Sequence, residues 1–93
     1  MPDEGCLFVD THVHLCDPRF DADRDAVLAR AAAAGVGRLV EIADSPDDWP
    51  RALALARSRP ATMRCALGLH PYYAERCTDE LLGRLAGQAA CAV

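Results

Sequence analysis

The chain lacks any long apolar segment and any basic leader. No stretch approaches the roughly 18 consecutive apolar residues that a membrane-spanning helix requires. Two of the first five residues, Asp3 and Glu4, are acidic, and no basic region followed by an apolar run is found there. No signal peptide is predicted, and we expect a cytoplasmic protein that does not contact a membrane.

Cysteine pairs at metal-binding spacing and an excess of basic charge are also missing. The five cysteines are odd in number and none is spaced as Cys-x-x-Cys, which argues against a disulfide framework and against a zinc ribbon. The formal net charge is −4, so no basic patch of the kind that binds duplex nucleic acid is predicted. A nucleic-acid substrate remains compatible with this charge, because a bound metal ion supplies positive charge locally.

The apolar pattern of the 93 residues predicts alternating strands and helices in one small domain. Predicted strands cover residues 7–14, 38–42 and 63–69, and a fourth strand is predicted to begin within residues 89–93. Helices are predicted over residues 21–35 and 45–59, and from residue 78 onward. Such strict alternation favours a parallel sheet with right-handed crossovers, of which about three and a half βα units are present.

Single residues predict where these helices begin and end. Gly35 is typical of the residue that follows a helix. Ser45, followed by Pro46, resembles the cap of the second helix, although Pro50 also allows a later start. Thr78 is the expected cap of the third helix.

A His-x-His pair at the end of the first predicted strand is the main functional signal. Alternate strand residues point the same way, so Asp10, His12 and His14 are expected to share one face. Two imidazoles at that spacing can bind one ion together, because neutral histidine is the commonest zinc ligand. The carboxyl ends of parallel strands are also where βα folds place their active sites.

Three further residues follow predicted strands or the histidine pair. His70, after the third strand, is a candidate third ligand, acid–base group or phosphate contact. Asp44, after the second strand, could approach the same site, but a turn or helix-cap role is the favoured interpretation. Cys16 could supply a thiolate ligand, but a free loop cysteine is favoured there.

Three segments together resemble the TatD-like metal-dependent hydrolases. They are FVDTHVHL at residues 8–15, DPRFDADR at residues 17–24 and GLHP at residues 68–71. His-x-His alone is shared by many amidohydrolase-like families, but its combination with the other two segments is more specific. The resemblance begins near Leu7 and implies the amino-terminal portion of a TIM (β/α)8 barrel.

The resemblance implies roles for four residues and a metal cofactor. His12 and His14 match the family's first two metal ligands, His70 matches a histidine that contacts the substrate, and Asp10 matches a neighbour that supports the metal site. One or two divalent ions, Mg²⁺ or Zn²⁺, are expected in the complete enzyme. Cys16 stands where the family often has a polar residue.

The family's remaining ligands are a glutamate after the fourth strand, two histidines and an aspartate, all beyond Val93. Since a complete barrel takes about 250 residues, residues 1–93 are expected to be a partial hydrolase domain truncated after the third βα unit.

The predicted function is metal-dependent hydrolysis of phosphodiester bonds, with DNA as the expected substrate. The 93-residue chain is expected to be inactive alone, with no stable protein partner. The alternatives are a C–N hydrolase of the amidohydrolase type, a phosphoesterase resembling polymerase-associated and histidinol phosphatases, and a non-catalytic remnant or metal-binding module. The GLHP segment argues against the first two.

Overall fold

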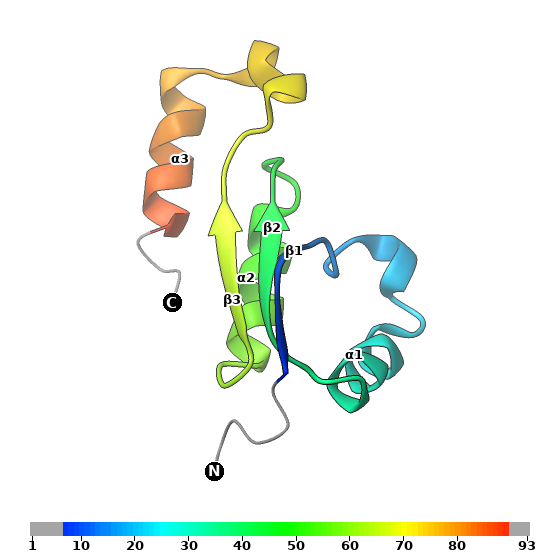
Figure 1. Ribbon diagram of the computed structural model, residues 1–93. Helices are drawn as coiled ribbons and strands as arrows, with labels where there is room; N and C mark the ends of the chain where they lie inside the picture. The colour runs from blue at the N-terminus through cyan, green and yellow to red at the C-terminus, as the bar shows by residue number, and fades with distance from the viewer. Residues whose placement is uncertain (1–6, 90–93) are drawn as a thin grey trace.

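The computed structural model describes residues 7–89, which form a three-stranded parallel sheet with helices on one face. The elements are β1 (Phe8–Val13), η1 (Pro18–Phe20), α1 (Arg24–Ala33), β2 (Val36–Ala43), α2 (Trp49–Ser58), β3 (Met63–Leu67), η2 (Pro71–Arg76) and α3 (Asp79–Ala89). The strand order is β1-β2-β3 and both neighbouring pairs are parallel (Figure 1). The predicted alternation of strands and helices is confirmed.

Gly35 joins the end of α1 to the start of β2, as predicted. Its φ of 97° lies in the left-handed region that glycine adopts without strain. The Gly35 carbonyl accepts hydrogen bonds from the main-chain N–H groups of Leu7 and Phe8, at 2.8 and 2.9 Å. A Cβ atom at this position would lie 3.1 Å from Cδ1 of Leu7. The helix end and the start of β1 therefore depend on the same glycine.

The start of α2 differs from the favoured sequence interpretation. Ser45 is not the cap, because α2 begins at Trp49 and Asp48 precedes it. The Ser45 hydroxyl instead donates to the Asp48 carboxylate at 3.0 Å within the preceding turn. Proline has no N–H to donate, so Pro50 fits only the first turn of a helix, and this selects the later start.

The third βα unit is partly as predicted. The Thr78 hydroxyl accepts the Leu81 N–H at 3.1 Å and caps α3 as expected. β3 ends at Leu67, before the predicted residue 69, and the unpredicted η2 follows. Ala89, expected in a fourth strand, is the last residue of α3. The rest of that predicted strand lies outside the described residues.

The core lies between the sheet and its helices. One cluster of buried side chains joins the sheet to α1 and α2: Leu15, Leu28, Leu39, Ala56 and Met63. A second cluster lies nearer the carboxyl ends of the strands: Cys16, Ala43, Trp49, Ala52 and Leu81. In Figure 1, α2 lies behind β2 and β3, while α3 runs beside β3.

Within residues 7–89, no helix covers the opposite face of the sheet. Along β3, Arg64 and Ala66 are exposed while Met63 is buried, so only one face of this strand is covered. At the β1 edge, the exposed fractions of Phe8 and Val9 are 61% and 54%. Within the part of the chain that is described, no helix is long and apolar enough to cross a membrane.

We expect the 93-residue chain to self-associate through β1. An edge strand with exposed apolar side chains is a template for pairing with another chain. Val9→Glu, opposite Arg38 in the register, should shift the population toward monomer in sedimentation velocity at micromolar concentration. Ala29→Glu on exposed α1 surface adds the same charge elsewhere and should not. A wild-type chain that is already monomeric, with a cooperative melt, would contradict this expectation.

We expect Cys16 to resist alkylation in the folded protein. Burial raises the pKa of the Cys16 thiol to about 12, and the adjacent Glu41 carboxylate adds to the effect. At pH 8 only about one Cys16 thiol in ten thousand is then ionised, and the thiolate is the reactive species. Iodoacetamide labelling read by tandem mass spectrometry should therefore modify exposed Cys77 far faster than Cys16. Equal rates at both positions in the folded protein would reject this, and denaturant should remove the difference.

Candidate functional site

The carboxyl end of β1 brings the two predicted metal ligands together. The ring centroids of His12 and His14 are 5.0 Å apart in an edge-to-face arrangement, and both residues are exposed. The register with β2 shifts between Asp10 and Val13, so β1 carries an extra residue there. Asp10 was expected to share a face with the histidines because side chains alternate along a regular strand. The bulge interrupts that alternation between Asp10 and Val13.

Asp10 contacts the histidine pair through the main chain. One oxygen of its carboxylate accepts the His12 N–H at 3.1 Å. That N–H lies within the irregular part of the β1–β2 pairing, and the carboxylate provides its hydrogen-bond acceptor. Asp10 therefore stabilises the local main-chain shape from which the His12 side chain projects.

The ring of His14 is oriented by β2. Its Nδ1 atom lies 3.0 Å from the carbonyl oxygen of Ile42. A carbonyl oxygen can only accept, so Nδ1 carries the proton and Nε2 keeps its lone pair. Histidines that bind metals commonly donate their other ring N–H to a main-chain carbonyl in this way. The geometry thus leaves Nε2 of His14 available to a metal ion.

His70 has the opposite tautomer. It precedes η2, and its Nδ1 accepts the main-chain N–H of Tyr72 at 3.0 Å. The uncharged ring must therefore carry its proton on Nε2, which makes that atom a hydrogen-bond donor. A protonated Nε2 has no lone pair for a metal ion, but it can donate to an anionic oxygen. This favours the phosphate contact among the three roles that the sequence left open.

β2 and α2 hold His70 at its place. The His70 N–H donates to the Asp44 carbonyl at 2.8 Å, just beyond the end of β2. Trp49, fully buried at the start of α2, donates its indole N–H to the Gly68 carbonyl at 2.7 Å. The segment that carries His70 is therefore attached both to the central strand and to the helix behind it.

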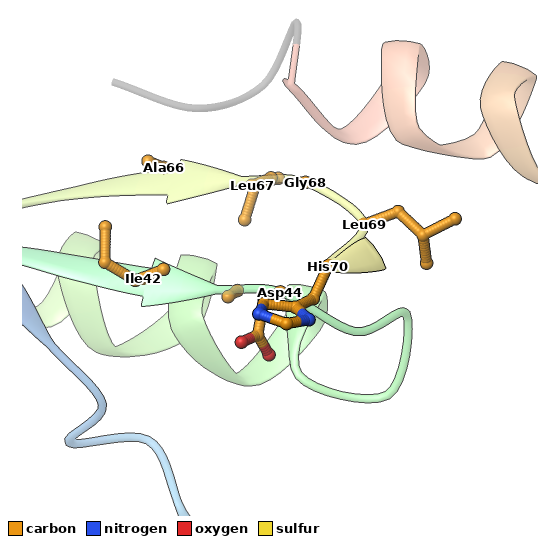
Figure 2. Close-up of a pocket in the computed structure, with 8 residues that line it drawn as sticks. Ile42, Asp44, Ala66, Leu67, Gly68, Leu69 and His70 are labelled. Carbon is orange, nitrogen blue, oxygen red and sulfur yellow. The ribbon is translucent and has the colours of Figure 1, made fainter. Parts of the chain in front are cut away.

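A shallow cavity of about 220 Å³ lies between the ends of β2 and β3. Figure 2 shows the imidazole of His70 and the carboxylate of Asp44 together at one end of it, with Ile42 further along β2. Asp44, for which a turn or cap role was favoured, therefore lines the same cavity as His70. The carbonyl of Ile42 also accepts the His14 ring N–H. Ile42 in β2 therefore contacts His14, and Asp44, just beyond β2, contacts His70.

Cys16 is not placed to bind a metal as a thiolate. Its side chain is buried in the second core cluster, and burial raises the pKa of the thiol to about 12, with Glu41 as a further cause. The thiol is consequently protonated at neutral pH, and a protonated thiol is a poor metal ligand. The favoured sequence interpretation, a free cysteine, agrees with the structure, although the residue is buried.

Two side chains near the site, Glu41 and Arg24, were not among the residues predicted from the sequence. Glu41 is fully buried, and its two carboxylate oxygens accept the N–H groups of Leu15 and Cys16 at 2.6 and 3.1 Å. The guanidinium of Arg24 donates to the carbonyls of Leu15 and Asp17 at 2.5 and 3.0 Å. The available signal was the glutamate inside the apolar segment 38–42, where alternation predicts a buried side chain. Arg24 also had a signal, because it ends the DPRFDADR segment that carried the family resemblance.

The described residues do not form a complete metal site. His12 and His14 fit the first ligands by their proximity and by the free Nε2 of His14. Within residues 7–89, no group of three or more His, Cys, Asp or Glu side chains is arranged to bind one ion. Stable zinc sites use three or four protein ligands, so this pair needs ligands from elsewhere.

Comparison with known proteins identifies relatives of this chain. The family described as TatD related DNase matches residues 9–92. The uncharacterized metal-dependent hydrolase YjjV of Escherichia coli is 42% identical over 86% of this chain and 30% of that protein. A 3'-5' ssDNA/RNA exonuclease TatD of Cronobacter turicensis is 37% identical over 87% of this chain and 30% of that protein.

The fold comparison agrees with the sequence comparison. The crystal structure of E. coli YjjV, a TatD homologue, matches 85% of this chain and 30% of its own length, with a TM-score of 0.75 and 42% identity. The parallel βα units therefore correspond to part of the TIM barrel predicted from the sequence, and the chain spans about 30% of the length of these relatives. The chain belongs to the TatD-related DNase family.

Proposed function

We propose that the chain is the amino-terminal part, residues 1–93, of a metal-dependent hydrolase domain that cleaves phosphodiester bonds in DNA. The observation that carries this proposal is the His14 ring, whose Nδ1–H is bound to the Ile42 carbonyl while the ring lies 5.0 Å from that of His12. The names of relatives add support, since one is called a metal-dependent hydrolase and another an ssDNA/RNA exonuclease.

Each site residue has a role in this proposal. His12 and His14 bind a divalent ion, Mg²⁺ or Zn²⁺, and one or two such ions occupy the complete site. A divalent ion held by these residues would supply positive charge that activates water and stabilises charge on the phosphate. Asp10 supports the metal site by accepting the His12 N–H. His70 donates its Nε2–H to a phosphate oxygen, a role supported by its tautomer.

A non-catalytic metal-binding module is the second candidate. It is supported by the lack, within residues 7–89, of a third ligand for the His12 and His14 pair. We also infer a cytoplasmic location and no stable protein partner, and both stay predictions.

We expect weak zinc binding that depends on both ligands of the pair. Two imidazoles provide fewer ligands than stable zinc sites have. Calorimetry with ZnCl₂ should give a measurable but weak affinity for the wild type, and His12→Ala or His14→Ala should lower it by about 10-fold or more. His70→Ala is the matched control, because it removes a histidine after β3 that is assigned to phosphate. Identical heats for the wild type and the two ligand variants would reject the site.

We expect no appreciable nuclease activity from the 93-residue chain, and metal-dependent cleavage of DNA once it is joined to the remaining part of a TatD-type barrel. Two-metal hydrolysis needs ions held about 4 Å apart, which one histidine pair cannot provide. In the joined protein, chelator should abolish activity, as should His12→Ala. His70→Ala should lower kcat by about 100-fold, comparable to the loss of one oxyanion donor, without changing metal affinity. A joined protein that hydrolyses amides but no phosphodiester would refute the proposed reaction.

A further inference from the structure

A buried carboxylate holds the main chain directly after His14. Glu41 has no exposed surface. Its carboxylate contacts the main-chain N–H groups of Leu15 and Cys16 and the thiol of Cys16, all in the segment after β1. The N–H of Leu15, which it accepts at 2.6 Å, belongs to the same peptide unit as the carbonyl of His14. The orientation of that peptide unit is therefore set by the Glu41 side chain.

The same segment is held from its other side by Arg24. The Nε–H of Arg24 donates to the Leu15 carbonyl at 2.5 Å, and its terminal N–H donates to the Asp17 carbonyl at 3.0 Å. An ion pair with Asp21 at 2.7 Å orients the guanidinium. Leu15 is thus held at its N–H by Glu41 and at its carbonyl by Arg24, so the backbone here has two independent restraints.

The ring of His14 depends on the next residue of β2. Glu41 restrains the main chain after His14, and the carbonyl of the adjacent Ile42 accepts the ring N–H at 3.0 Å. Both restraints come from one rigid strand, so a shift of the His14 main chain away from Glu41 would also lengthen the bond from its ring to Ile42. That bond selects the tautomer that leaves Nε2 free.

We propose that Glu41 and Arg24 are positioning residues for His14: by holding the main chain of Leu15 on both sides, they keep the His14 imidazole on the Ile42 carbonyl with Nε2 available to a metal ion. This inference rests on the proposed function for the metal, but the tautomer of His14 can be measured without any metal present.

Packing alone does not account for a carboxylate at position 41. Leu39 and Ala43, on the same face of β2, are buried and apolar. A buried charge is costly to desolvate, and replacing one by a well-packed apolar side chain is often neutral or stabilising. The carboxylate provides something that an apolar side chain cannot, namely two acceptors for adjacent main-chain N–H groups.

Glu41→Gln and Arg24→Lys test the proposal. The glutamine amide keeps one acceptor, but its NH₂ group faces an N–H that it cannot accept. The lysine keeps the charge of Arg24 but loses the forked geometry that reaches two carbonyls. Leu39→Ala is the matched control, since it weakens the same face of β2 without contacting Leu15 N–H or carbonyl. ¹⁵N NMR of the imidazoles reports the His14 tautomer, and titration with ZnCl₂ followed by the same signals reports metal affinity.

We expect both positioning variants to shift His14 from the pure Nδ1–H tautomer toward a mixture and to weaken zinc binding by about 10-fold. Leu39→Ala should lower the melting temperature while the tautomer stays as in the wild type. If Glu41→Gln does not fold, Arg24→Lys alone decides the question by the same readouts. A folded positioning variant with the wild-type tautomer would overturn the proposal. If the wild type binds no zinc but the tautomer shifts as expected, the positioning role stands and the metal site is rejected.

Discussion

The hydrogen bonds from Leu15 and Cys16 to the buried carboxylate of Glu41 are the constraint on which this end of the structure depends. They connect the segment after β1 to the central strand across more than twenty residues of sequence. Desolvating a carboxylate costs several kcal/mol in a protein interior, and charge-assisted bonds to two N–H groups offset that cost. Losing either bond would leave an unsatisfied buried group.

Two neighbouring features accompany that contact. Arg24 adds a second restraint through the carbonyls of Leu15 and Asp17. Cys16 is kept inside the core beside Glu41, where burial, reinforced by the carboxylate, raises the pKa of its thiol. The thiol of Cys16, which is close to the histidine pair in the sequence, is therefore protonated and buried.

β2 organises the two histidine sites from the middle of the sheet. The Ile42 carbonyl binds the ring of His14, and the Asp44 carbonyl binds the main chain of His70. The two rings receive opposite tautomers, because the first donates from Nδ1 and the second accepts at Nδ1. The end of β2 thus orients a ring with a free Nε2 lone pair after β1 and a ring with an Nε2–H donor after β3.

The sequence alone determined the order of the strands and helices, because local apolar periodicity and capping residues decide where each begins and ends. It also determined that each of the three histidines lies at or after the end of a strand. It did not determine that α2 begins at Trp49, although Pro50 allowed that start, nor the bulge in β1 that changes the relation of Asp10 to His12. The hydrogen-bond partners of Glu41 and the tautomer of His14 were decided only by tertiary structure. Each depends on a contact between groups far apart in the chain, such as the 26 positions that separate Leu15 from Glu41. No local pattern specifies which distant main-chain group a buried side chain will meet.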